Sequence, residues 1–153
     1  IRDVERSRGL GDVYKRQQAR SVINRLISKV GLNPKRYEIA DGSGLSLYNY
    51  LSAELEVRLL RYAFQNNNIY MHLRPSLPIA GEDGILRKRM TGVFTAGNVR
   101  AKTGTVQGVS SLAGYCTAAN GHRLAFSIIN QGIQHHSNGR AFQDRVCTVL
   151  CQP

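Results

Sequence analysis

The residues best suited to chemistry form the short run Lys102, Thr103, Gly104 and Thr105. The lysine supplies a cation and the threonines supply hydroxyl groups, a combination that suits the carboxylate end of a peptide. Within residues 99–115, Val, Ala and Thr alternate with basic residues on the way into this run, which predicts a strand. Glycine lets another backbone approach closely. The run therefore predicts a strand edge that can bind an extended ligand.

A second group of polar side chains lies in the loop of residues 41–49, whose sequence is DGSGLSLYN. Ser43, Ser46 and Asn49 lie between a predicted short strand and a predicted helix, where a glycine-rich turn can aim side chains into a cleft. An ordinary turn rich in small polar residues explains the same pattern. Both interpretations stay open from these residues alone.

Three amphipathic helices are predicted, because apolar residues recur at spacings of three and four in residues 18–30, from about Ser52 onwards, and in residues 138–150. Ser52 is a suitable N-cap for the second helix. The expected buried face of that helix consists of Ala53, Val57, Leu60 and Phe64. The expected buried face of the last helix consists of Ala141, Phe142, Val146, Val149 and Leu150.

Strands are predicted at residues 37–40, 98–105, 110–117 and 123–129. The last two are joined by residues 118–121, which end in Asn-Gly, a strong hairpin signal. Residues 66–89 are expected to be rich in loops, with Arg87–Arg89 in a short solvated helix. The order helix, loop, antiparallel sheet, helix predicts an α+β fold, with the sheet flanked by helices.

Length and charge limit the classes of function. The chain has 153 residues, of which 42% are hydrophobic, enough for one domain with a core. No apolar run reaches the roughly 18 residues that a membrane span needs, and no secretory signal is present. The net charge of +11 favours anionic partners, such as nucleic acid or carboxylate-bearing substrates. The basic residues are scattered and lack an aromatic platform, so we do not expect nucleic-acid binding.

The cysteines do not indicate a metal site. Cys116, Cys147 and Cys151 form no Cys-x-x-Cys pair, and the histidines have no metal-ligand spacing. Buried small residues are the simplest interpretation, and one strand-to-helix disulfide is the alternative in an oxidising compartment. We expect neither a metal nor a cofactor.

Residues 1–17 lack a steady helical or strand period and resemble translated adapter sequence. We therefore predict that they are a non-native or disordered leader, and that residues 18–153 form the domain. A natural flexible or basic arm is the alternative.

Three stretches in this order resemble the penicillin-binding D-Ala-D-Ala carboxypeptidases and endopeptidases of low molecular mass: DGSGLSxxN at 41–49, SLPIAGEDG at 76–84 and AKTGT at 101–105. The resemblance covers about residues 18–151. It implies the C-terminal part of a β-lactamase/transpeptidase-like domain, located in the periplasm or cell envelope. Peptidoglycan stem peptides are the implied substrates and β-lactams the implied inhibitors.

That family has a Ser-x-x-Lys nucleophile motif, a Ser/Asn loop motif and Lys-Thr-Gly. Lys102, Thr103 and Gly104 match the third motif. A Ser-x-Asn spacing is absent, and Ser46 and Asn49 are the candidate pair, with Ser43 as an alternative. No lysine of this chain has a serine three positions before it. The nucleophile is therefore expected upstream of this chain, which alone is expected to be inactive.

The chemistry that the resemblance implies is acyl transfer through a covalent seryl intermediate. Ser46 would pass a proton to the departing amine, and Asn49 would hold the substrate amide. Lys102 and Thr103 would bind the terminal carboxylate, and the N–H of Thr105, after Gly104, would be one oxyanion donor. A basic polyanion- or nucleic-acid-binding module and a serine β-lactamase are the alternative functions.

Overall fold

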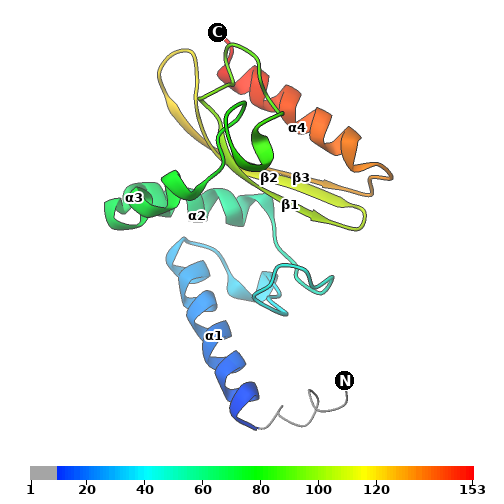
Figure 1. The fold of residues 1–153 in the computed structure, drawn as a ribbon. Helices are drawn as coiled ribbons and strands as arrows, with labels where there is room; N and C mark the ends of the chain where they lie inside the picture. The colour runs from blue at the N-terminus through cyan, green and yellow to red at the C-terminus, as the bar shows by residue number, and fades with distance from the viewer. Residues whose placement is uncertain (1–9) are drawn as a thin grey trace. The chain divides into compact units, whose positions relative to one another are not determined.

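The computed structural model describes residues 10–153, which divide into two compact units at the boundary between Leu51 and Ser52 (Figure 1). Residues 1–9 of the predicted leader lie outside the described residues. The first unit contains one long helix and the polar loop, and the second contains the antiparallel sheet with its helices. The α+β class predicted from the sequence is confirmed in the second unit.

The first unit is built around helix α1 (Leu10–Lys29), followed by the short 3₁₀-helix η1 (Pro34–Arg36). The chain leaves α1 at Gly31, whose φ of 82° is left-handed and therefore favours a residue without Cβ. The predicted helix is confirmed, but it begins at Leu10 rather than at Gln18. Extending a helix is far easier than nucleating one, so a segment with weak periodicity can continue it.

The strand predicted at residues 37–40 is wrong in extent, because only one antiparallel pair forms, between Glu38 and Tyr50. The N–H of Glu38 donates to the Tyr50 carbonyl at 3.1 Å, and the N–H of Tyr50 donates to the Glu38 carbonyl at 2.8 Å. The chain then turns at Asp41, whose carboxylate accepts hydrogen bonds from the loop itself. The pair closes the base of the loop.

Helix α2 (Ala53–Gln65) opens the second unit at the predicted N-cap, where the Ser52 hydroxyl accepts a hydrogen bond from the Leu55 N–H at 3.2 Å. The predicted buried face of Ala53, Val57, Leu60 and Phe64 is only partly right, since Phe64 is 43% exposed while Leu55 and Ala63 are buried. The helix is attached to the sheet by two hydrogen bonds, from the Tyr115 hydroxyl to the Leu60 carbonyl at 2.7 Å and from the Ser127 hydroxyl to the Glu56 carboxylate at 2.6 Å.

Helix α3 (Asn67–Ser76) corrects the prediction of loop for this segment. Pro75, which favoured loop, falls in the last turn of the helix. The Tyr70 ring packs edge-on against Phe64 and Tyr115, with ring centroids 5.1 and 5.4 Å apart. These contacts with distant residues stabilise a helix that local propensity does not indicate.

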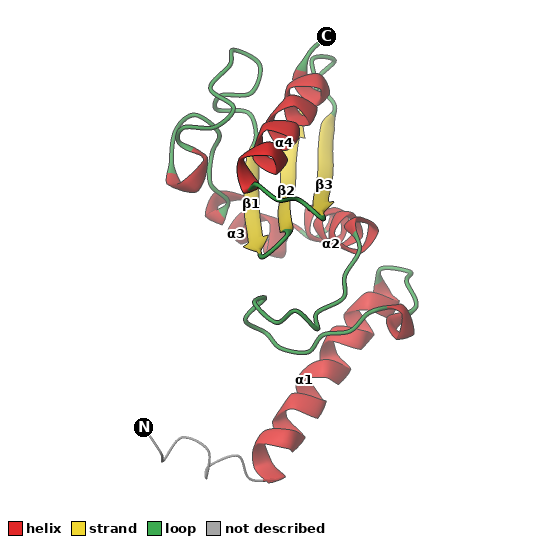
Figure 2. Ribbon diagram, turned by 90° about the vertical axis from the view of Figure 1, so that its right-hand side faces the viewer, coloured by secondary structure: helices red, strands yellow, loops and turns green. Residues whose placement is uncertain are grey.

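Strands β1 (Arg100–Val106), β2 (Val109–Thr117) and β3 (Arg123–Gln131) form an antiparallel sheet in the order β1-β2-β3 (Figure 2). The three predicted strands are confirmed, with ends that differ by at most about two residues. The predicted hairpin is also confirmed: the N–H of Ala118 donates to the His122 carbonyl at 2.9 Å, and Gly121 has a φ of 83°.

Helix α4 (His136–Cys151) lies on one face of the sheet, while α2 contacts the other face through Tyr115 (Figure 2). The predicted buried face of α4 is only partly right, because Ala141, Phe142 and Val149 are exposed while Leu150 packs against the core. The helix instead buries Gly139, Gln143, Cys147 and Cys151. Small and polar residues face β2 because the helix lies close to the strand and forms hydrogen bonds with it.

The three cysteines are free thiols in this structure and lie in the core beneath α4, so their prediction as buried residues is confirmed. Burial raises the pKa of Cys116 and of Cys147 to about 12, and burial also raises that of Cys151. Protonated thiols are poor nucleophiles. The cysteines therefore act as packing residues in this structure.

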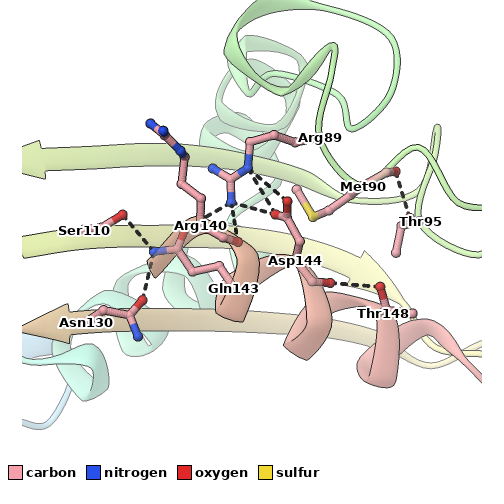
Figure 3. Close-up of polar contacts among 9 residues, drawn as sticks. All are labelled: Arg89, Met90, Thr95, Ser110, Asn130, Arg140, Gln143, Asp144 and Thr148. Atoms are coloured by element: carbon pink, nitrogen blue, oxygen red, sulfur yellow. Dashed lines mark hydrogen bonds and ion pairs between the residues drawn. The ribbon is translucent and has the colours of Figure 1, made fainter. Parts of the chain in front are cut away.

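Arg89 overturns the prediction of a solvated helix at residues 87–89. Its side chain is only 12% exposed and forms an ion pair with Asp144 of α4 at 2.7 Å (Figure 3). It also donates to the Gln143 side-chain oxygen at 3.0 Å, and Gln143 donates in turn to Ser110 at 3.1 Å and Asn130 at 3.0 Å. A buried guanidinium requires such partners. We call these five residues the Arg89 network, and it joins α4 to two strands.

Candidate functional site

The loop of residues 41–49 is organised by the carboxylate of Asp41. The Ser43 hydroxyl donates to it at 2.7 Å, the Asn49 side-chain amide donates at 2.9 Å, and the Gly44 N–H donates at 3.3 Å. The hydrogen bonds from Ser43 and Asn49 lower the pKa of Asp41 below its ordinary value of 3.8. A charged Asp41 therefore fixes the shape of the loop.

The two candidate residues of this loop have different surroundings. The Ser46 oxygen accepts a hydrogen bond from the Tyr48 N–H at 3.2 Å, which leaves the hydroxyl proton able to donate. The Asn49 side-chain oxygen accepts from the N–H groups of Ala40 at 2.8 Å and Asp41 at 3.3 Å. Both ends of the Asn49 amide are thus engaged within the loop, and its role toward substrate stays a prediction.

The order of this loop should depend on Asn49 and on pH. We expect Asn49→Ala to expose the amides of Ala40 and Asp41 to faster hydrogen exchange, because their acceptor is removed. Folding lowers the pKa of Asp41, so the charged carboxylate stabilises the loop fully above about pH 4. This stabilisation is lost as the pH falls through the lowered pKa. Exchange measured by NMR between pH 3 and 6 checks both effects. Protection that is independent of Asn49 and of pH would contradict this description.

The outer edge of β1 is partly covered by the segment SLPIAGEDG. The Ala101 N–H donates to the Pro78 carbonyl at 3.1 Å, and the Ala80 N–H donates to the Val99 carbonyl at 2.9 Å. Backbone groups of alternate residues point to the same edge of a strand. The backbone groups of Thr103 and Thr105 therefore point outward like those of Ala101, beyond the covered part, where an extended ligand can add.

The side chains of β1 alternate between the two faces of the sheet. Thr103 and Thr105 line a cavity of about 240 Å³ on the face that carries α4, together with Ile85, Arg89, Ser110 and Arg140. Gly104 belongs to the other face, where an added Cβ would meet the Ser111 hydroxyl. Lys102 shares that face by the same alternation. The two hydroxyls and the lysine thus leave the strand in opposite directions.

Lys102 is exposed, and its ammonium donates a hydrogen bond to the Thr103 carbonyl at 2.7 Å. That carbonyl points to the outer edge of β1, so the ammonium turns toward the edge where we expect the ligand. The position is accessible and electropositive, as the sequence pattern predicts.

The structure brings together Lys102, Thr103, Gly104 and Thr105 in the second unit, while Ser46 and Asn49 belong to the first. Two residues beside the threonines, Arg89 and Arg140, were not identified as candidates. Arg89 lies in a basic cluster, which suggests exposure to solvent. The residues that it contacts are 51 to 55 positions further along the chain. The sequence feature that could have indicated this position is the glycine before Arg140, because a glycine inside a predicted helix suggests that another element packs closely against it.

Among residues 10–153, no helix combines the length and apolar character needed to cross a membrane. The same residues include no cluster of His, Cys, Asp and Glu side chains able to hold a metal ion.

An antiparallel sheet with a helix across one face and Lys-Thr-Gly-Thr on an edge strand is the arrangement that the resemblance to the transpeptidase-like class implies, and a solved structure confirms the fold. The solved structure of penicillin binding protein 4 from Haemophilus influenzae matches 90% of this chain with a TM-score of 0.78 and 29% identity. This chain covers 32% of that structure, and the same protein has also been solved in complex with a β-lactam.

The family model that matches residues 5–152 is described as D-Ala-D-Ala carboxypeptidase 3 (S13). A D-alanyl-D-alanine carboxypeptidase from Actinomadura sp. (strain R39) is 38% identical over 137 residues, which are 85% of this chain and 24% of that protein. The D-alanyl-D-alanine carboxypeptidase DacB of Haemophilus influenzae is 36% identical over 106 residues, 68% of this chain and 22% of its own length. The chain belongs to the D-Ala-D-Ala carboxypeptidase 3 (S13) family. It spans about a quarter of the length of these relatives.

Proposed function

We propose that this chain is the C-terminal part of a serine-type D-Ala-D-Ala carboxypeptidase or endopeptidase that acts on peptidoglycan stem peptides through an acyl-enzyme. The observation that carries the proposal is the accessible edge of β1, which presents Lys102, Thr103 and Thr105 within a family match over residues 5–152. Residues 18–153 would then be the C-terminal part of the penicillin-binding domain. We refer below to the protein that also contains the upstream Ser-x-x-Lys motif as the complete protein.

In this proposal the substrate lies along the outer edge of β1 and adds one strand to it. The Thr105 N–H points to that edge and donates to the oxyanion that forms on the scissile carbonyl. The hydroxyls of Thr103 and Thr105 bind the terminal carboxylate. The ammonium of Lys102, beside the Thr103 carbonyl, supplies positive charge next to the reacting groups.

The loop of residues 41–49 supplies the remaining groups. Ser46, whose proton is able to donate, passes a proton to the departing D-alanine, and the upstream serine attacks the carbonyl carbon. Asn49 supports the loop through one side-chain N–H, which donates to Asp41, and holds the substrate amide through the second N–H of the same group. β-Lactams, which resemble the substrate, acylate the upstream serine. An enzyme of this kind works in the cell envelope, where peptidoglycan lies.

Labelling with a fluorescent penicillin tests the proposed acyl-enzyme. We expect the complete protein to be labelled covalently at the serine of its Ser-x-x-Lys motif, and the 153-residue chain to remain unlabelled, because no serine in it precedes a lysine at that spacing. Mass spectrometry of the digested conjugate identifies the labelled residue. Labelling of any serine in the 153-residue chain would show that the nucleophile has been assigned wrongly.

A further inference from the structure

The cavity beside β1 contains a cation whose charge no described residue balances. Two of its lining residues are arginines. The Arg89 guanidinium is paired with Asp144 at 2.7 Å. The Arg140 side chain is exposed and forms no ion pair or hydrogen bond with any residue in the described part of the chain. The cavity therefore has a net positive charge, which comes from Arg140.

The packing of α4 brings Arg140 to this position. The preceding residue, Gly139, is buried, and an added Cβ there would lie 2.9 Å from Ile133 Cδ1 and 3.2 Å from Ser110 Cβ. Glycine thus allows the start of α4 to approach β2 closely. In Figure 3 the Arg140 side chain extends away from Arg89 and Asp144. Its position near the N-terminal end of a 16-residue helix adds the positive end of the helix dipole.

Hydroxyl donors surround the same cavity. The side chains of Thr103 and Thr105 have no hydrogen-bond partner within residues 10–153. The Ser110 oxygen accepts a hydrogen bond from Gln143 at 3.1 Å, so its own proton is able to donate. A guanidinium beside unengaged hydroxyls is complementary to a carboxylate, which accepts hydrogen bonds at both oxygens.

We propose that Arg140 is a specificity-determining residue that binds the terminal carboxylate of the peptide substrate, together with the hydroxyls of Thr103 and Thr105. This inference rests on the proposed function and deepens it, because it assigns the charge that selects a free C-terminus. Lys102 leaves β1 on the opposite face from the two hydroxyls. Arg140 therefore supplies the positive charge on the hydroxyl face, and the Lys102 ammonium remains at the edge of the strand.

The kinetic test compares a peptide ending in D-Ala-D-Ala with its C-terminal amide, using variants of the complete protein. Arg140→Ala should lower kcat/KM for the acid by about 10- to 100-fold, mainly through KM, and for the amide by less than about threefold. Arg140→Lys should restore part of the loss, because it keeps the charge without the planar fork. Arg145→Ala is the matched control, since Arg145 is also an exposed arginine of α4 but does not line the cavity. Equal losses for acid and amide, or equal behaviour of the Arg140 and Arg145 variants, would overturn the assignment.

A binding test separates this inference from the proposed function. The amide signals of Thr103 and Thr105 in the 153-residue chain are followed by NMR during titration with N-acetyl-D-alanine and with its amide. We expect the acid alone to shift them, with affinity at least about tenfold weaker in Arg140→Ala and unchanged in Arg145→Ala. Binding that Arg140→Ala leaves intact refutes the Arg140 site even if the complete protein is active. Arg140-dependent binding in a protein without peptidase activity refutes the proposed function and retains the site.

Discussion

Replacing Lys102 with alanine in the complete protein should lower kcat/KM for a D-Ala-D-Ala peptide by about 10- to 100-fold, the equivalent of one charge-assisted interaction of about 1.5 to 3 kcal/mol. The fold should be unaffected, because the side chain is exposed and its hydrogen bond in this structure goes to its neighbour's carbonyl. Lys102→Arg should restore the activity only in part, since a planar guanidinium does not reproduce the geometry of a compact ammonium.

The amide of the same peptide separates two roles for Lys102. Lys102 and the threonine hydroxyls lie on opposite faces of β1, so we expect Lys102→Ala to lose activity toward the amide as well as the acid. That result would show that the ammonium acts on the reacting groups. A loss confined to the acid would instead assign it to the carboxylate. Lys88→Ala serves as the control, because Lys88 is exposed in the turn before Arg89. If the Lys102 and Lys88 variants are equally active, Lys102 has no role in the reaction.

The largest loss of stability is expected from Asp144→Ala. Without the carboxylate, the Arg89 side chain, 12% exposed, retains two acceptors among the residues that the structure describes, the Gln143 oxygen at 3.0 Å and the Arg140 carbonyl at 3.4 Å. Leaving a buried charge without its partner costs about 3 to 5 kcal/mol. Because Asp144 itself is 29% exposed, we expect a smaller value, about 2 to 3 kcal/mol in the free energy of unfolding. Urea denaturation followed by circular dichroism measures it.

Glu54→Ala provides the matched control for this ion pair. Glu54 pairs with Arg58 at 2.9 Å on the surface of α2, and both side chains are about half exposed, at 51% and 44%. Surface pairs of this kind contribute at most about 1 kcal/mol. If Asp144→Ala costs no more than Glu54→Ala, the Arg89 network does not hold α4 to the sheet. Loss of α4 packing would also displace Arg140, so the variant should weaken carboxylate binding.

The sequence predicts those elements whose signal is local. The Asn-Gly hairpin, the Ser52 N-cap and the three strands are confirmed because turn chemistry, capping and alternation are properties of adjacent residues. Helix α3 was missed because its tyrosine packs against rings from other elements. The buried face of α4 was partly mispredicted for a related reason: an amphipathic pattern favours Phe142 and Val149, whereas hydrogen bonds to β2 and β3 bury Gln143.

Some residues of the candidate site could likewise be predicted from the sequence, and others could not. Lys102, Thr103, Gly104 and Thr105 are adjacent in the sequence and could be found as a motif. Arg140 could not, because its place beside the threonines follows from the packing of α4 on the sheet. The role of Asn49 is also altered by contacts that the motif does not specify, since its amide holds Asp41 and the base of the loop. A motif indicates which residues are present, and the fold determines which atoms remain free.

The most direct test of the central claim is the release of D-alanine by the complete protein. A peptide ending in D-Ala-D-Ala should lose one D-alanine per molecule, detected by a stereospecific oxidase assay. Its counterpart ending in L-Ala-L-Ala should remain intact, and prior treatment with benzylpenicillin should abolish the release. A cross-linked stem-peptide dimer, assayed in parallel, distinguishes endopeptidase from carboxypeptidase activity. Failure to cleave any D-Ala-D-Ala substrate, or cleavage that benzylpenicillin leaves unchanged, would contradict the assignment of this chain to a serine-type D-Ala-D-Ala peptidase.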